Sequence, residues 1–385
     1  MAEFGFTEAQ EMFRNMVRDF TRRELFPGAK ERMKLNRVPP DIIKKLSDAG
    51  LTGLRVPEKY GGQMSDAVSG GIACEETARA DLGAALTVLM GVFAGEMLAR
   101  CTEEIQAEWM PLVAKGEKII SLWLTEPDAG SDAAGIKARA VKDGDYYILN
   151  GEKTPSTMGM QADAGGMWFK TDPMAAGVGG ITAFIVPLDL PGIERKPEAH
   201  VGFRTVEPAY AVMNDVRIPA KYRVGDEGKG FYIGMGVFDW MRVYLALQVL
   251  ALGEQSIYDA IDYAKQRTTF GKPIAKYDAV SFRLVDSLAK IEAARLLCYK
   301  ALWLSDQGRR ASKETAMAKS LCPTIGIEAC NNAMLAFGHV GYSSDYLVEQ
   351  RLRDAYGFEF ADGTADIQRV VMVREIIGKE FLNYT

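Results

Sequence analysis

The stretch IISLWLTEPDAGSD, residues 119–132, decides the fold, because the pattern of apolar residues changes there. A short apolar run is closed by a turn of small and polar residues, which is typical of a β-strand. Similar runs follow, bounded by Gly, Pro or Asp, at residues 145–153, 165–172, 180–189 and 209–219. Together they predict a small domain of antiparallel strands over residues 118–225.

Helical patterns flank these strands on both sides. Residues 7–115 carry apolar residues at three- and four-residue spacing, and the same period returns after Gly225 and Gly228. One face of a long C-terminal helix is marked by Leu284, Leu288, Ile291, Ala294, Cys298 and Ala301. We therefore predict an α+β fold with an N-terminal α domain (1–117), a middle β domain (118–225) and a C-terminal α domain (226–385).

Composition excludes several classes of function. The 385 residues carry a formal net charge of −5 without a dense Lys/Arg block, so nucleic acid is not an expected partner. Five cysteines without a CxxC spacing and only two histidines indicate neither a metal site nor a disulfide framework. The longest apolar run, residues 243–252, is too short to span a membrane, and the N-terminus lacks the pattern of a signal peptide. We expect a cytoplasmic protein that binds neither metal nor membrane.

Few single residues point to chemistry by themselves. The turn LTEPDAGSD, residues 124–132, exposes backbone N–H groups and the hydroxyls of Thr125 and Ser131, which suits an anionic or carbonyl-rich ligand. A plain turn explains the same composition. No GxGxxG opens a helix after a strand and no P-loop is present, which argues against a Rossmann dinucleotide site.

Four separated segments carry a family resemblance. In chain order they are LTEPDAGSD (124–132), NGEKTPSTMG (150–159), QRTTFGKP (266–273) and RLRDAYGFEFADGTADIQR (351–369). They resemble the signatures of the FAD-dependent acyl-CoA dehydrogenases, a family with an N-terminal helical domain, a middle β-barrel-like domain and a C-terminal four-helix bundle. The family's catalytic base is the Glu of a YEGT tetrad, and here the tetrad is ADGT, residues 361–364.

The resemblance implies a role for individual residues. Asp362 would be the catalytic base, since Met241 stands where some members carry an alternative Glu. The residues implied in binding FAD are Leu122, Leu124, Thr125, Ser131, Thr157, Arg267, Phe270, Thr364 and Asp366. The residues implied in binding the acyl-CoA are Ser131, Asp239, Arg242, Ala361, Asp362 and Gly363.

Departures from the family pattern suggest the substrate. Replacing Glu by Asp retracts the carboxylate by one C–C bond, about 1.5 Å. Ala361 stands in place of Tyr and Pro155 in place of Trp, so two large rings are missing. We expect a pocket widened for an acyl group branched at the α-carbon, in particular an alicyclic one, as in cyclohexane-1-carboxyl-CoA.

The resemblance also implies partners, and it leaves alternatives. Family members assemble as homotetramers and pass electrons to electron-transferring flavoprotein. The alternatives are a short- or branched-chain acyl-CoA dehydrogenase, a nitroalkane oxidase-like enzyme, a cyclic-diene-forming dehydrogenase, and a catalytically silent binding protein on the same fold. Retention of an acid at position 362 speaks against the diene-forming enzyme.

Overall fold

The computed structural model describes residues 5–175 and 177–382. The chain divides into two compact units. A helical unit contains the described residues within 1–34, 66–85 and 242–385, and a β unit contains residues 35–65 and 86–241. The division falls inside two helices, α5 (Leu82–Leu98) and α7 (Gly230–Gln266).

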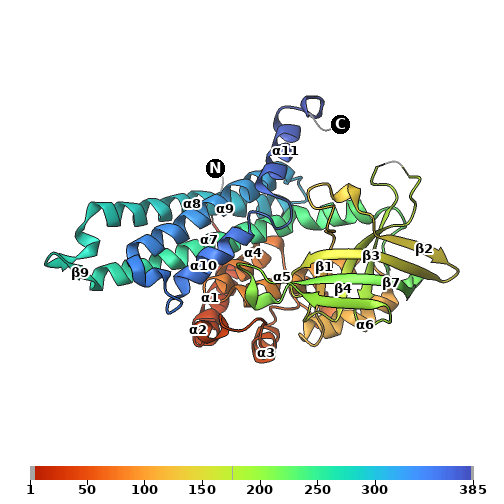
Figure 1. Ribbon diagram of the computed structural model, residues 1–385, viewed down its shortest axis with the longest axis horizontal. Helices are drawn as coiled ribbons and strands as arrows, with labels where there is room; N and C mark the ends of the chain where they lie inside the picture. Colours follow the sequence, from red (N-terminus) through yellow and green to blue (C-terminus); the bar gives the residue numbers. More distant parts are fainter. Residues whose placement is uncertain (1–4, 176, 383–385) are drawn as a thin grey trace. The chain divides into compact units, whose positions relative to one another are not determined.

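Helix α9 (Ser312–Phe337) is the central element of the helical unit, since it packs against α8, α10 and α11. Figure 1 shows α8 and α9 lying side by side. Helix α4 in turn packs against α1 and α8. The other helices of this unit are α1 (Glu8–Phe20), α2 (Ala29–Arg32), α4 (Ala67–Ala78), α8 (Asp278–Asp306), α10 (Leu347–Gly357) and α11 (Ala365–Ile376).

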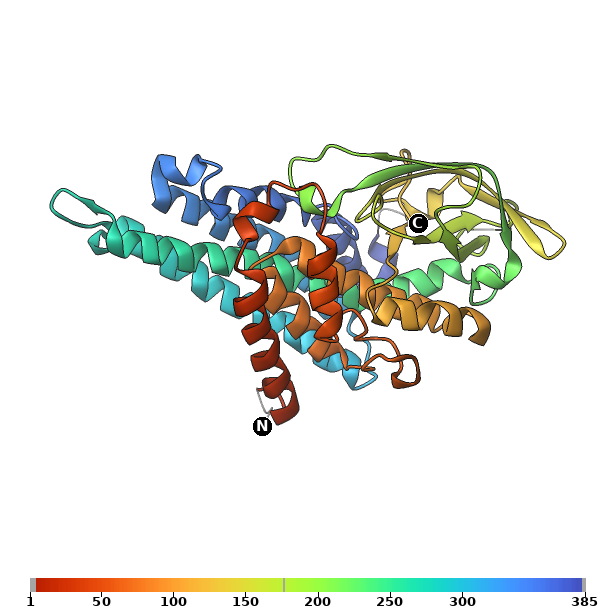
Figure 2. The same ribbon diagram turned by 90° about the horizontal axis from the view of Figure 1, so that it is seen from below.

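The predicted face of α8 is largely correct. Leu284, Ile291, Ala294, Cys298 and Ala301 are buried along this helix. A short hairpin, β9 (Thr268–Thr269) with β10 (Lys272–Pro273), joins α7 to α8. Figure 2 shows this hairpin, drawn in teal, beyond the ends of the helices that it joins.

A buried network of charges ties three helices of this unit together. Arg295 on α8 reaches Glu75 on α4 at 2.6 Å and also pairs with Glu254 on α7. Arg79, which directly follows the last residue of α4, reaches the same Glu254 at 2.6 Å. Removing one member would leave an uncompensated buried charge, so the network fixes which helix faces meet.

The β unit is built on one mixed sheet. Its strand order is β6-β7-β3-β2-β4-β5-β8, with β1 pairing β4 off this path. Most neighbours are antiparallel as predicted, but β4 runs parallel to both β1 and β2. The strands are β1 (Ile120–Trp123), β2 (Arg139–Asp143), β3 (Tyr146–Ser156), β4 (Ala164–Lys170), β5 (Ile181–Pro187), β6 (Ile193–Pro197), β7 (Ala209–Pro219) and β8 (Arg223–Val224).

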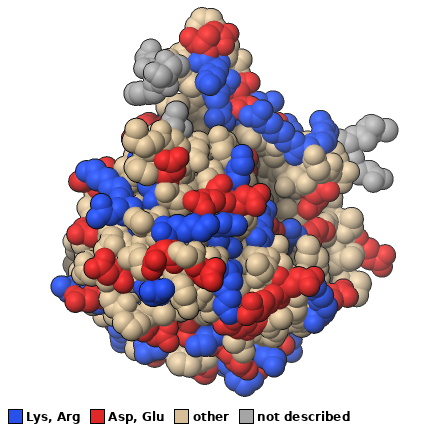
Figure 3. All heavy atoms as spheres, turned by 90° about the vertical axis from the view of Figure 1, so that its right-hand side faces the viewer, with Lys and Arg blue, Asp and Glu red and all other residues tan. Residues whose placement is uncertain are grey.

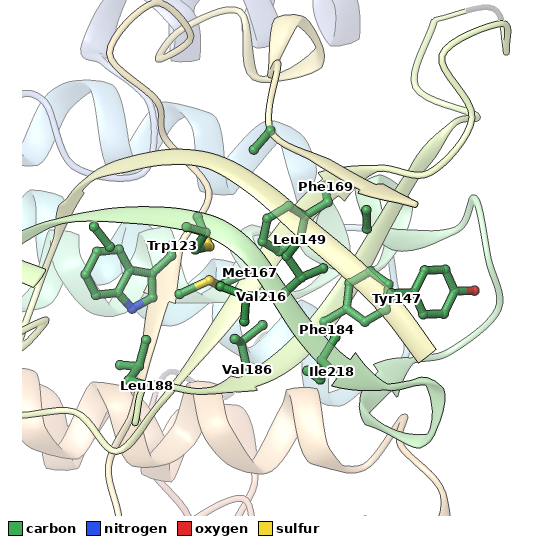
Figure 4. Packing of buried hydrophobic residues seen from close by; sticks show 14 of the residues in the cluster. Trp123, Tyr147, Leu149, Met167, Phe169, Phe184, Val186, Leu188, Val216 and Ile218 are labelled. Atoms are coloured by element: carbon green, nitrogen blue, oxygen red, sulfur yellow. The ribbon is translucent and has the colours of Figure 1, made fainter. Parts of the chain in front are cut away.

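Strands β4 and β5 are buried over nearly their whole length. This burial explains their continuous apolar runs, because a strand covered on both faces has no polar side. Figure 4 shows the resulting core, in which the Phe184 ring meets those of Tyr147 at 4.9 Å and Phe169 at 6.0 Å. On α7, the Gly230 carbonyl accepts a hydrogen bond of 2.8 Å from the Trp168 indole. The unit also contains α3 (Pro40–Asp48) and α6 (Glu103–Ala114).

Charge is finely mixed on one face of the surface. On the face drawn in Figure 3, Lys and Arg side chains alternate with Asp and Glu over short distances.

Helix α7 is long and apolar enough to cross a membrane by composition, but 72% of its most apolar window is buried inside the protein. This burial is typical of the core helix of a globular protein.

A close approach of two helices gives a test of the packing. A Cβ added at Gly70 on α4 would lie 2.3 Å from the Tyr244 hydroxyl of α7, which donates to the Ala67 carbonyl at 2.8 Å. We predict that Gly70→Ala lowers the free energy of unfolding by about 1–3 kcal/mol, measured by urea denaturation. The matched change Gly236→Ala, where a Cβ meets open space, should raise it by about 1 kcal/mol. A Gly70→Ala variant as stable as the parent would contradict this packing.

Candidate functional site

Residues 361–364 form a tight turn that leads from α10 into α11. Asp362 and Gly363 both adopt left-handed backbone, with φ of 53° and 94°. Gly takes this conformation without strain and Asp tolerates it better than most side chains. Thr364 then caps α11, because its hydroxyl accepts from the Ile367 N–H at 3.2 Å. The ADGT sequence therefore fits the local backbone that it forms.

In the part of the chain that the structure describes, the Asp362 carboxylate lacks a hydrogen-bond partner at one of its two oxygens. Its Oδ2 atom is buried and has no hydrogen-bond partner among the described residues. Burial raises the pKa of Asp362 above its ordinary value of 3.8, while the charges of Arg242 and Lys319 lower the pKa in part. A buried carboxylate with a raised pKa and an open acceptor is suited to take up a proton.

A second polar side chain beside this turn is also unsatisfied. Gln368 on α11 is 1% exposed, and neither end of its amide has a partner within the described chain. Its Nε2 would lie 2.9 Å from a Cβ built at Gly363. Buried polar atoms are nearly always paired, so the open atoms of Asp362 and Gln368 indicate that a ligand completes this site.

Two cations hold the backbone around Asp362. The Arg242 guanidinium donates from Nε to the Asp362 carbonyl at 2.9 Å. Lys319 donates from Nζ to the carbonyls of Phe358 at 2.7 Å and Gly363 at 3.3 Å. Of these two, the sequence pointed to Arg242 only. The available signal for Lys319 was a single Lys within the small and apolar run TAMAKSLC, residues 315–322.

The predicted flavin turn of the β unit follows directly after β1. A buried ion pair fixes it, since Lys153 on β3 donates to Glu126 at 2.8 Å and to the Leu124 carbonyl at 3.1 Å. Glu126 also accepts from the N–H groups of Lys137 and Ala138. Sequence reasoning gave neither Lys153 nor Glu126 a role, and only the structure shows that both are buried.

In the same unit, β3 is joined to the turn that carries the predicted flavin contacts after β1. The Thr154 N–H donates to the Thr125 carbonyl at 2.9 Å, which joins the end of β3 to the turn after β1. Thr125 and Thr157 are half-buried, and neither hydroxyl enters a hydrogen bond with another described residue. Leu122 is half-buried, Leu124 is buried and Ser131 is exposed. Open hydroxyls beside apolar side chains fit a large, partly polar ring such as a flavin.

The remaining predicted residues lie along α7 and at the start of α11. Asp239 and Arg242 are three residues apart on α7, and Met241 between them is 1% exposed. Asp366 is exposed and pairs with Arg369 at 2.6 Å. Because Arg242 binds the Asp362 carbonyl, the structure brings Arg242 together with the turn of Ala361, Asp362, Gly363 and Thr364 in the helical unit.

Arg267 and Phe270 are not part of that region. Along α7, 24 residues separate Arg242 from the last residue, Gln266, which is about 36 Å at the rise of an α-helix. Arg267 follows that end, and Phe270 in the hairpin is 93% exposed. Within one chain these two residues lie far from Asp362.

Comparison with known proteins covers the whole chain. Models of three acyl-CoA dehydrogenase domains match in order: the N-terminal domain at residues 7–117, the middle domain at 121–216 and the C-terminal domain at 228–377. An acyl-CoA dehydrogenase of Bacillus subtilis (strain 168) is 37% identical over 97% of this chain and 99% of the relative. The caffeyl-CoA reductase-Etf complex subunit CarC of Acetobacterium woodii is 36% identical over 97% of this chain and 100% of that subunit. The structure of butyryl-CoA dehydrogenase from Megasphaera elsdenii has a TM-score of 0.92 at 35% identity, covering 98% of this chain and 100% of that one.

The buried pair in the β unit can be tested by a mutant cycle. We predict that Lys153→Met destabilises the protein by about 3–5 kcal/mol, because it leaves the Glu126 carboxylate buried without its cation. Adding Glu126→Gln should recover part of that loss in urea unfolding. The exposed pair of Lys137 with Asp128, at 2.7 Å, provides the control, and Lys137→Met should change stability little.

The same pair predicts a pH dependence. Burial lowers the pKa of Lys153 from 10.5 to about 8, although Glu126 raises it in part. Between these pH values the unfolded chain holds a proton that the folded chain has lost, so this group makes the folded state more stable as pH rises. Lys153→Met should lose that rise, and identical pH profiles for parent and variant would contradict the assignment.

Proposed function

This chain belongs to the acyl-CoA dehydrogenase family, and we propose that it α,β-dehydrogenates an acyl-CoA with an alicyclic acyl group, such as cyclohexane-1-carboxyl-CoA. It is an oxidoreductase of the CH–CH class. The observation that carries the proposal is the buried, unpartnered Oδ2 of Asp362 in the tetrad that replaces the family's YEGT.

FAD is the cofactor of this family, and it supplies the acceptor for the β-hydride when bound. The open hydroxyls of the β unit fit its ring. We assign the contacts with FAD to Leu122, Leu124, Thr125, Ser131 and Thr157 in the β unit, and to Thr364 and Asp366 at the start of α11.

Asp362 carries the proton chemistry. Its carboxylate takes the α-proton of the thioester, and its backbone N–H donates to the thioester oxygen, which stabilises the negative charge that develops there. Docking of the acyl group excludes water from the carboxylate and raises its pKa further toward that of the carbon acid. Arg242 holds the Asp362 carbonyl at 2.9 Å, so the N–H and the carboxylate keep a fixed orientation.

The shape of the substrate follows from residues 361 and 362. A carboxylate about 1.5 Å shorter than that of Glu does not reach a straight chain seated in the usual way. A misplacement on this scale lowers rates roughly 100-fold. Ala361 is half-buried and leaves room where the family has a Tyr ring, and an α-carbon within a ring uses that room and meets the shorter acid. Asp239, Arg242 and Gly363 are assigned to the same substrate, and Ser131 to its CoA arm.

A panel of thioesters tests the substrate. We predict that kcat/KM for cyclohexanecarboxyl-CoA exceeds those for butyryl-, octanoyl- and isobutyryl-CoA by at least about tenfold, measured with an artificial electron acceptor. The structural similarity to butyryl-CoA dehydrogenase favours a short straight chain as the second candidate. A clear preference for butyryl-CoA would overturn the alicyclic assignment and keep the family activity.

If Asp362 is the base, its replacement should abolish most turnover, and kcat/KM of the parent should fall at acidic pH. Asp362→Asn should lower kcat at least about 100-fold with FAD still bound, since Asn also tolerates the left-handed backbone. In the parent, kcat/KM should fall on acidification with a midpoint above 3.8, because the pKa of Asp362 is raised and the base must be ionised. Asp345→Asn, an exposed carboxylate before α10, is the control and should keep full turnover. An active Asp362→Asn variant would refute the assignment.

Partners follow from the same proposal. The similar caffeyl-CoA reductase subunit belongs by name to a complex with Etf, which supports an electron-transferring flavoprotein as the acceptor. The family resemblance implies that Arg267 and Phe270 contact the FAD of a neighbouring subunit, within a homotetramer in the cytoplasm. Their separation of about 36 Å along α7 from Arg242 supports that assignment. A nitroalkane oxidase-like enzyme would instead form peroxide without an acceptor protein.

A further inference from the structure

We propose that Lys319 is a positioning residue: its ammonium holds the backbone on both sides of Asp362 and thereby fixes the base for proton abstraction. This inference rests on the proposed role of Asp362. Lys319 itself touches neither substrate nor cofactor in this scheme, since it acts through main-chain carbonyls.

The geometry of the contact carries the inference. Lys319 is fully buried on α9, and its Nζ donates to the carbonyls of Phe358 at 2.7 Å and Gly363 at 3.3 Å. Phe358 has no exposed surface, so one end of the bridged segment is anchored in the core. The other end is the left-handed pair Asp362–Gly363. One side chain therefore closes the loop that carries the base.

The positive charge of Lys319 beside Asp362 affects the protonation of the proposed base. Asp362 faces two cations, Lys319 from α9 and Arg242 from α7. Lys319 in turn faces Asp362, Glu359 before the turn, Arg242, and Cys322 one turn along α9. Burial lowers the pKa of Lys319 to about 8, although Asp362 and Glu359 raise it in part. Below that pH its positive charge favours the ionised form of Asp362, which is the form that accepts a proton.

Replacing a lysine that only filled the core would have a different effect from replacing a positioning residue. Loss of such a residue lowers stability, but it leaves the pH dependence of the reaction where it was. Removal of a charged positioning residue should increase the mobility of residues 358–364 and should also shift the pH at which kcat/KM falls on the acid side. These two measurements are therefore made on the same variants.

The variants are Lys319→Met, which removes the donors and the charge, and Lys319→Arg, which keeps both. Lys313→Met is the matched control, because Lys313 lies on the same helix, is partly exposed and pairs with Glu314 at 3.4 Å. In hydrogen exchange of the FAD-loaded protein, amides of residues 358–364 should exchange at least about tenfold faster in Lys319→Met. Lys319→Arg should restore most of the protection, and Lys313→Met should match the parent.

The pH profile is measured with the acyl-CoA that the parent turns over best. Lys319→Met should move the acid limb of kcat/KM upward by about one pH unit and lower kcat more than it raises KM. Lys319→Arg should leave the limb in place. Faster exchange with an unmoved limb would reduce Lys319 to a structural residue, and unchanged exchange would overturn the proposal outright.

Failure of the proposed function is distinguishable from failure of this inference. If the FAD-loaded parent turns over no acyl-CoA, the assignment of the base falls. Hydrogen exchange still decides in that case whether Lys319 holds the segment around Asp362.

Discussion

A buried ammonium bound to backbone carbonyls holds each of the two turns that we propose as parts of the site. Lys153 reaches the Leu124 carbonyl in the β unit, and Lys319 reaches those of Phe358 and Gly363 in the helical unit. Burying an ammonium is costly, so each lysine is compensated by a carboxylate, Glu126 or Asp362. A turn that would otherwise be mobile thereby acquires the rigidity of the core.

In this arrangement, the residues that hold the backbone differ from the residue that we propose to react. The residue that we propose as the base, Asp362, lies on irregular backbone, where an unusual conformation such as its own is possible. The residues that hold the two turns lie on regular elements, β3 for Lys153 and α9 for Lys319. Under the proposed function, a change of substrate can then arise by replacing a side chain on the turn, such as that of residue 361, without rebuilding its support.

The fold was largely predictable because its signals are local. The apolar runs of β4 and β5 and the periodic face of α8 are confirmed. Strands β2 and β6 escaped prediction because their sequences, RAVKD and IERKP, are mostly polar and exposed. The turns at 124–132 and 361–364 were singled out through family signatures, and their functional roles stay a proposal. Lys319, Lys153 and Gln368 were not, because an isolated polar residue in a sequence does not reveal that it is buried or which carbonyl it meets.

The left-handed backbone at position 362 also limits how this protein can diverge. Few side chains accept such a φ, and Asn is among them. One nucleotide separates an Asp codon from an Asn codon, so a descendant can lose the acid and keep the turn, the capped helix and the packing. If Asp362 is the base, as we propose, a non-catalytic acyl-CoA binder is one genetic step away on an intact fold, and sequence similarity across the whole chain would scarcely register the change.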